Sequence, residues 1–280
     1  MTVPTVPTVP TVTLNNGVQM PQLGFGVFQV PNGETTAAVT TALQAAYRSI
    51  DTAAIYGNEE GVGRAIANAG IPREELFITS KVWNADHGFD ATLRAYDDTL
   101  GKLGLDSLDL YLIHWPAPGR GLYVQTWRAL EKLYGEGRVR AIGVSNFQPA
   151  HLERLVAESE ITPAVNQVEL HPALQNRAVI AANTALGVAT EAWSPLAQGA
   201  VLGDPAVLAI AAHHGVTPAQ AVLRWHLQQG RIVIPKSVTP ARIAENLDVF
   251  GFDLTDAELA AIDTLNRDGR TGPHPDEFHG

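Results

Sequence analysis

The sequence contains no cysteine, and this absence excludes several kinds of chemistry. Without thiols the chain can form no disulfide, no thiolate nucleophile and no cysteine-ligated zinc site. Histidines and carboxylates remain as possible metal ligands, but no His-Glu-x-x-His motif occurs. His213 and His214 are adjacent, so they are expected to point to different sides of a helix. We therefore expect no catalytic metal.

Long apolar runs and an excess of positive charge are also missing. A membrane-spanning helix needs about 18 consecutive apolar residues, and no such run occurs. The first residues, Met1 to Pro4, have neither the basic segment nor the apolar stretch of a secretory signal. A formal net charge of −10 argues against nucleic acid or an anionic membrane as a partner. We expect a cytoplasmic protein that would hold any phosphate ligand by a local cluster of cations.

The length and the apolar content indicate a globular protein with a large core. With 280 residues, 45% of them hydrophobic, the chain fits a single α/β barrel, for which about 250 residues are typical, or two smaller domains. No linker-like stretch divides the sequence. We therefore expect residues 13–280 to form a single domain.

The N-terminal twelve residues repeat a Val-Pro-Thr triplet. Proline at every third position favours an extended, unpaired backbone, so residues 1–12 are expected to form a disordered arm. A proline-rich ligand for a partner protein is the alternative interpretation. Beyond the repeat, Val12-Thr13-Leu14 and Val18-Gln19-Met20 flank the turn sequence Asn15-Asn16-Gly17. This order predicts a short β-hairpin.

From residue 22 onward, short aliphatic or β-branched runs alternate with helical patterns. Eight strands with intervening helices predict an α/β fold of the closed, parallel (β/α)8 or TIM-barrel type. The expected strands are Leu23 to Gly26, Ser49 to Thr52, Leu76 to Lys81, Leu108 to His114, Ala141 to Ser145, Val165 to Glu169, Val188 to Trp193 and Arg231 to Pro235.

Late in the chain there are more helix-start signals than a simple alternation of one strand and one helix requires. Two helical segments, Pro205 to His214 and Thr217 to Gln229, lie between the seventh and eighth expected strands. Thr217 and Thr255 each begin a capping-box sequence, with Gln220 and Glu258 three residues later. We therefore expect the barrel to carry two extra helices in addition to the N-terminal hairpin.

Four reactive side chains occur where expected strands give way to loops: Asp51, Tyr56, Lys81 and His114. Taken singly, each has a plain alternative, since a loop tyrosine, an exposed Asp/Lys pair or a lone histidine is usually structural. In a parallel barrel, however, the C-terminal strand ends converge on one mouth. A lysine beside a tyrosine stabilises the phenolate and lowers the tyrosine pKa, which suits proton donation to a carbonyl.

Three ordered motifs resemble the aldo-keto reductase family, and the resemblance runs from Leu14 to the C-terminus. Residues 191–196 and 273–278 resemble the short bacterial branch that includes diketogluconate reductases. Two departures are Ala46, where the family commonly has glycine, and Trp193, where many members have tyrosine. The motifs are Tyr47-Arg48-Ser49-Ile50-Asp51-Thr52-Ala53 with Tyr56-Gly57-Asn58-Glu59 and Val62-Gly63, then Ile142-Gly143-Val144-Ser145-Asn146-Phe147, and Ile234-Pro235-Lys236-Ser237 with Arg242 and Glu245-Asn246.

The resemblance implies NADPH-dependent reduction of aldehydes and ketones, with small carbonyl compounds or keto-sugars as substrates. Hydride would come from the nicotinamide and the proton from Tyr56, while Lys81 lowers the tyrosine pKa, Asp51 holds Lys81 and His114 orients the carbonyl. A unit charge at about 4 Å could lower a tyrosine pKa by up to about three units, and Asp51 would oppose part of that shift.

The cofactor site cannot be a Rossmann site, because no Gly-x-Gly-x-x-Gly follows the first strand. Lys236 and Ser237 instead precede a helix start, and Arg242 falls in its first turn, an arrangement that attracts phosphate. A solvated surface with ordinary capping is the alternative. The resemblance assigns these three residues to the ribose phosphate of NADP, and Asn246, with help from Glu245, to the adenine side.

At the nicotinamide end the resemblance supplies a second set of residues. Ser145, Asn146 and Gln167 would bind the carboxamide, although such side chains often only close loop hydrogen bonds. Trp193 would stack on the ring, although buried tryptophans are usually simple packing. The residues expected near the pyrophosphate are Ser194, Leu196 and Gln198.

Aromatic residues after three strands are candidates for the substrate pocket. Phe28, Trp83 and Trp115, together with His114, would form its apolar wall, or could be rim packing. A short loop at residues 116–120 and a brief C-terminal tail predict an open pocket. Two other functions remain: a Schiff-base lyase with Lys81 as nucleophile, and a non-catalytic nicotinamide-nucleotide sensor. The family resemblance favours a monomer.

Overall fold

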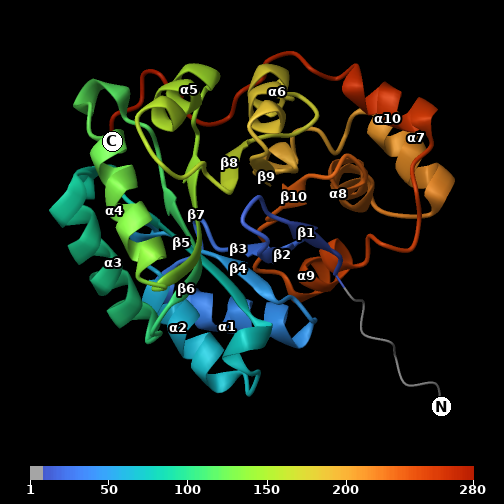
Figure 1. Ribbon diagram of the computed structural model, residues 1–280. Helices are drawn as coiled ribbons and strands as arrows, with labels where there is room; N and C mark the ends of the chain where they lie inside the picture. Colours follow the sequence, from blue (N-terminus) through green and yellow to red (C-terminus); the bar gives the residue numbers. More distant parts are fainter. Residues whose placement is uncertain (1–8) are drawn as a thin grey trace.

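Eight parallel strands form the central sheet of the computed structural model, which describes residues 9–280 (Figure 1). The first and last of these strands are joined by backbone hydrogen bonds from the Gly24 N–H to Val233 and from the Val233 N–H to Gln22, so the sheet closes. The predicted barrel is therefore confirmed. In chain order, which is also the order in the sheet, the strands are β3 (Phe25–Gly26), β4 (Ser49–Asp51), β5 (Phe77–Val82), β6 (Leu108–Ile113), β7 (Val139–Ser145), β8 (Val165–Glu169), β9 (Ala189–Trp193) and β10 (Ile232–Val233).

The strands are buried because helices cover the outside of the barrel while side chains fill the inside. Strands β5 and β6 are buried at every position, as expected for parallel strands with both faces covered. The covering helices are α1 (Asn32–Gln44), α2 (Glu59–Asn68), α3 (Phe89–Leu103), α4 (Tyr123–Gly135), α5 (Pro149–Ala157), α6 (Arg177–Ala185), α8 (Pro218–Gln228) and α9 (Pro240–Leu247). Short 3-10 helices are η1 (Ala54–Tyr56), η2 (Arg73–Glu75), η3 (Asn84–Asp86), η4 (Pro118–Arg120) and η5 (Ala197–Gly199).

Two helices are additional to the repeat, as predicted. They are α7 (Pro205–His214) and α10 (Asp256–Asp263), which lie against each other outside the barrel (Figure 1). Both capping boxes are present, because the hydroxyls of Thr217 and Thr255 accept from the N–H groups of Gln220 and Glu258. Among the described residues no single helix is long and apolar enough to cross a membrane; α7 and α8 pass that test only as a pair bent by 90°.

The predicted N-terminal hairpin consists of β1 (Thr11–Thr13) and β2 (Gln19–Pro21), paired antiparallel. Leu14 and Met20 of this hairpin pack on buried apolar residues of the barrel, including Phe77 and Leu110, which closes the N-terminal end. Residues 1–8 of the Val-Pro-Thr segment lie outside the described residues. Thr11 pairs with Pro21, so strand β1 begins inside the segment expected to be an arm.

The C-terminal tail runs along the mouth of the barrel and supplies Pro273 and Phe278 to the cavity lining. From α10 it runs past α6 and α5 and ends near α4 (Figure 1). Glu169, the last residue of β8, accepts from the Thr271 N–H at 2.6 Å and the Gly272 N–H at 3.1 Å. Near the end of the tail, the ring of Phe278 lies 4.6 Å from the ring of Trp115. The tail therefore forms part of the rim of the pocket, and the broad substrate tolerance expected of an open pocket stays a prediction.

Candidate active site

A cavity of ≈ 1020 Å³ opens at the C-terminal ends of the barrel strands. Every residue predicted for the site lines this cavity except Lys81, which has no exposed surface and lies beneath the lining. The structure thus brings together side chains that are spread over more than two hundred positions of sequence. The lining includes Phe28, Asp51, Tyr56, Trp83, His114, Trp115, Ser145, Asn146, Gln167, Trp193, Ser194, Leu196, Gln198, Lys236, Ser237, Arg242, Glu245 and Asn246.

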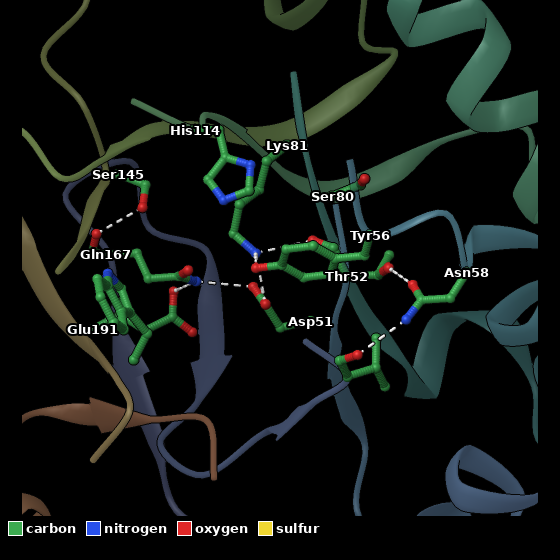
Figure 2. A network of polar contacts seen from close by, with 12 residues as sticks. Asp51, Thr52, Tyr56, Asn58, Ser80, Lys81, His114, Ser145, Gln167 and Glu191 are labelled. Atoms are coloured by element: carbon green, nitrogen blue, oxygen red, sulfur yellow. Dashed lines mark hydrogen bonds and ion pairs between the residues drawn. The ribbon is translucent and has the colours of Figure 1, made fainter. Parts of the chain in front are cut away.

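The ammonium group of Lys81 is fully committed to three acceptors (Figure 2). Its Nζ donates to Asp51 Oδ1 at 2.6 Å, to the carbonyl oxygen of Thr52 at 2.9 Å and to Tyr56 Oη at 3.4 Å. Burial alone would lower the pKa of Lys81, but the charge of Asp51, helped by Tyr56, outweighs it and raises this pKa above its usual value. Lys81 is therefore a permanently charged cation beside the tyrosine hydroxyl.

The hydroxyl of Tyr56 faces the cavity and keeps its proton. Burial is the largest influence and raises the pKa of Tyr56; Lys81 acts in the opposite direction, and Asp51 cancels part of the effect of Lys81. The net direction is upward, so the expectation of a lowered tyrosine pKa is wrong for this ligand-free structure. The physical reason is burial, which outweighs the charge of Lys81 once Asp51 has cancelled part of that charge's effect.

His114 is a neutral imidazole beside the tyrosine. Burial, then the charge of Lys81, holds the pKa of His114 well below its usual range. Its ring lies 5.6 Å from the ring of Tyr56 and 5.1 Å from that of Trp83, both edge to face. A neutral histidine retains one N–H donor and one acceptor nitrogen, so it can orient a polar group in the cavity without adding charge.

The residues predicted for the nicotinamide form one hydrogen-bonded group. Asn146 Nδ2 donates to the carbonyl oxygen of His114 at 2.9 Å, and Trp193 Nε1 donates to Asn146 Oδ1 at 2.8 Å. The Ser145 hydroxyl donates to the backbone oxygen of Gln167 at 2.8 Å. These bonds hold an indole, a hydroxyl and two amides in fixed positions on one wall of the cavity.

A second wall comes from the loop after β9, whose backbone is unusual. Ser194, Ala197 and Gln198 have φ values of 48°, 50° and 54°, in the left-handed region that residues other than glycine rarely adopt. Such strain persists where surrounding structure imposes it and is concentrated at binding sites. The loop is positioned to place Ser194, Leu196 and Gln198 on the cavity.

The far end of the cavity carries the positive charge. Lys236 and Arg242 are exposed, and neither forms an ion pair with another residue in the range 9–280. They flank the start of α9, where the capping residue Thr239 makes no side-chain bond to the helix, so its first amides lack a cap. Glu245 accepts from the Thr217 hydroxyl at 2.8 Å. This end can accommodate an anion.

Several lining residues were not predicted from the sequence. Ile55 lies in η1 after β4, and its position beside Tyr56 was an available signal. Phe278 and Pro273 come from the tail, and Thr217 from the start of α8. No local pattern marks these three, because they reach the cavity only through the path of the tail and the docking of α8. A further buried group beneath the lining, Glu191, was not predicted either.

The two adjacent histidines of α7 both reach Glu258 of α10, so the expectation that they point to different sides is wrong. His213 Nδ1 lies 2.8 Å from Glu258 Oε1, and His214 Nε2 lies 3.0 Å from Glu258 Oε2. Hydrogen bonds from His214 and Thr255 outweigh burial and hold the pKa of Glu258 at about 2. These three side chains are close enough to hold a metal ion, but they do not line the cavity, and their ligand atoms already pair with one another.

Comparison with known proteins agrees with this geometry. The family model described as "Aldo/keto reductase family" matches residues 22–267. Glyoxal reductase of Bacillus subtilis is 55% identical over 268 residues, covering 95% of this chain and 96% of that protein. Methylglyoxal reductase DkgA of Escherichia coli is 51% identical over 271 residues, covering 96% and 98%. A crystal structure of a Gox0644 mutant in complex with NADPH has a TM-score of 0.94 at 48% identity and covers 97% of this chain and 99% of that one. The protein belongs to the aldo/keto reductase family.

Proposed function

We propose that the protein reduces aldehydes and ketones to alcohols with NADPH and acts on small carbonyl compounds or keto-sugars. The observation that carries the proposal is the 3.4 Å contact between Lys81 Nζ and Tyr56 Oη at the floor of the cavity. Lys81 donates in that contact, so the hydroxyl hydrogen of Tyr56 remains free to point into the cavity. A phenol held this way can protonate a carbonyl oxygen.

The donor set of the cavity fits NADPH at both ends. Gln167 lines the cavity, and its side-chain carbonyl oxygen accepts no bond from any residue between 9 and 280, so it can receive an amide N–H of the nicotinamide. Lys236, Ser237 and Arg242 would hold the ribose phosphate at the uncapped start of α9. The NADPH complex of the similar Gox0644 mutant supports NADPH as the cofactor. When bound, the nicotinamide supplies hydride to the carbonyl carbon.

The proposed roles of the protein's own groups follow from their protonation. Tyr56 keeps its proton because its pKa is raised, which is the state a general acid needs at the start of a reduction. Lys81, charged and 3.4 Å away, stabilises the phenolate left after proton transfer. Asp51 keeps Lys81 charged and in place, and neutral His114 orients the carbonyl.

A Schiff-base lyase is less compatible with the site. A nucleophilic lysine must lose its proton, whereas Lys81 has three acceptors and a raised pKa. A sensor protein without turnover would not need Tyr56 and Lys81 in contact at the cavity floor. Because two similar proteins are named glyoxal reductase and methylglyoxal reductase, small dicarbonyl compounds are the first substrates to test.

Replacing Tyr56 by Phe tests the proposal. Loss of the acid should lower kcat by at least about 10²-fold, the usual scale for general acid catalysis, while NADPH affinity stays near that of the wild type. Turnover is followed by NADPH oxidation with glyoxal, methylglyoxal, larger aldehydes and keto-sugars. Tyr134→Phe, outside the cavity lining on α4, is the matched control. Full turnover in the Tyr56 variant would refute the assignment.

A further inference from the structure

Glu191, on β9, is a buried carboxyl group that the reaction described above does not use. It has no exposed surface, and it lies beneath the cavity beside Gln167 (Figure 2). Its Oε2 accepts from Gln167 Nε2 at 2.8 Å. Its Oε1 has no hydrogen-bond partner among residues 9–280. A buried carboxyl with one unsatisfied oxygen is costly, so its presence at this point requires an explanation.

The amide of Gln167 bridges two carboxyl groups. Its Nε2 donates to Asp51 Oδ2 and to Glu191 Oε2, each at 2.8 Å, so both amide hydrogens are used (Figure 2). If the amide were turned over, its carbonyl oxygen would face two carboxyl oxygens. The two acids therefore fix one orientation, in which the carbonyl oxygen is the free end of the amide.

The charge beneath Tyr56 depends on whether Glu191 carries a proton. The charged or titratable groups that face it are Asp51 of β4, Lys81 of β5 and Tyr56 of η1, and the neighbouring strands contribute Gln167 and Ile232, which do not titrate. Burial, and then the charge of Asp51, raises the pKa of Glu191 to about 8. With the proton present, Lys81 and Asp51 balance; without it, the group has one net negative charge, which raises the pKa of Tyr56 further.

We propose that Glu191 is a positioning residue of this site: its carboxyl group holds the Gln167 carbonyl oxygen toward the nicotinamide carboxamide, and its proton keeps the charge beneath Tyr56 neutral. The role toward the nicotinamide depends on the proposed function. The role of the proton does not, because it concerns groups present in the ligand-free protein.

Infrared titration of the ligand-free protein tests the protonation state. A protonated carboxyl stretch should disappear as the pH rises through about 8, and Glu191→Gln should lack this transition. Glu169→Gln is the matched control: Glu169 is also buried, but hydrogen bonds with His171, Thr271 and Gly272 lower its pKa, so that variant should retain the transition. No carboxyl titration near pH 8 in the wild type, or one that persists in Glu191→Gln, would overturn this part of the proposal.

Cofactor affinity tests the positioning. Glu191→Gln keeps an acceptor for the Gln167 amide and should change the Kd for NADPH by less than about threefold, whereas Glu191→Met removes the acceptor and should raise it about tenfold. Circular dichroism checks that both variants are folded, and Glu191→Leu replaces the Met variant if that one is unfolded. Unchanged NADPH affinity in the folded apolar variant would contradict the positioning role.

The pH profile links the two parts. In the wild type, kcat should fall above pH 8, because ionised Glu191 raises the pKa of Tyr56 further and makes the tyrosine a weaker acid toward the carbonyl oxygen. In Glu191→Gln this decline should move to higher pH. Identical profiles would contradict the effect on Tyr56. A wild type that binds no NADPH and turns over no carbonyl compound would refute the proposed function instead, while the infrared titration would still decide whether Glu191 carries a proton.

Discussion

At the scale of single residues, the site depends on a charge pair that burial makes sensitive to change. Lys81 is completely buried, and its partner Asp51 is 3% exposed. Two buried charges stabilise each other only while both are present, because removing one leaves the other unpaired in a medium of low polarity. The Asp51–Lys81 pair therefore contributes to the stability of the folded protein as well as to the chemistry of the site.

Replacing Asp51 by Asn should lower the free energy of unfolding by about 3–5 kcal/mol, the usual cost of breaking a buried pair. Urea unfolding followed by circular dichroism measures the change. Asp97→Asn is the control: Asp97 is 60% exposed and pairs with Arg138 at the surface, so its loss should cost less than about 1 kcal/mol. Equal effects of the two substitutions would show that Lys81 gains a substitute partner when Asp51 is absent.

His87 makes stability depend on pH in the acid range. Burial, then the charge of Arg120, lowers the pKa of His87 to about 4, and neither ring nitrogen has a hydrogen-bond partner among the described residues. The unfolded chain binds this proton near pH 6.5 and the folded protein only near pH 4. The contribution of His87 is therefore fully present above about pH 6.5 and is lost as the pH falls toward 4.

The expected size of this effect is about 3 kcal/mol, from a pKa difference of about 2.5 units. Urea unfolding at pH 7 and pH 4.5 should show a smaller difference between the two pH values for His87→Gln than for the wild type. His274→Gln, at an exposed position, serves as the reference. A His87 variant with the same pH dependence as the wild type would rule out this histidine as the source.

At the scale of elements, the turn after α1 places an alanine, Ala46, in a backbone conformation that favours glycine. Ala46 has a φ of 85°, a conformation that glycine adopts readily and alanine does not. The family resemblance expects glycine here, and the structure shows why. The strain lies in the backbone that leads from α1 into β4.

Ala46→Gly should therefore stabilise the protein by about 1 kcal/mol, because it relieves a left-handed alanine. Thermal unfolding should show a higher Tm than that of the wild type. Ala45→Gly, one residue earlier with an ordinary φ of −75°, should lower the Tm, because there glycine adds only freedom to the unfolded chain. A lower Tm for Ala46→Gly would mean that loss of the Ala46 side-chain contacts outweighs the relieved strain.

The start of α9 is the element proposed to distinguish NADPH from NADH. Arg242→Ala should reduce the preference for NADPH about tenfold in kcat/KM, because the ribose phosphate would lose one of its two cations. Parallel assays with the two cofactors measure the preference. Arg128→Ala on α4, away from the cavity, should leave it unchanged. An unchanged ratio in the Arg242 variant would count against a phosphate site at α9.

At the scale of the whole molecule, one cavity collects side chains from the strand ends of the barrel, from α8 and α9, and from the tail. The barrel supplies its floor, and the tail, tied to Glu169, supplies part of its rim. The hairpin closes the opposite end. The fold thus places the polar groups at one end of the barrel and seals the other with apolar residues.

Much of this arrangement could be predicted because it depends on local order along the chain. Alternating strand and helix patterns indicate the barrel, and parallel strands must bring their C-terminal ends together, so Asp51, Lys81 and His114 had to converge. The capping boxes at Thr217 and Thr255 depend on residues three positions apart. The same reasoning places Lys236 and Arg242 beside a helix start. All of these features follow from neighbours in sequence.

What only the tertiary structure decided depends on distances between residues far apart in sequence. The pKa of Tyr56 is raised because burial and Asp51 outweigh Lys81, and the packing of β4, β5 and η1 sets that balance. Glu191 becomes part of the site through a bond to Gln167, and the tail lies at the mouth because Glu169 binds one part of it and Trp115 packs against Phe278. The sequence determined which groups meet; packing determined their separations and their access to water, and these control their charge.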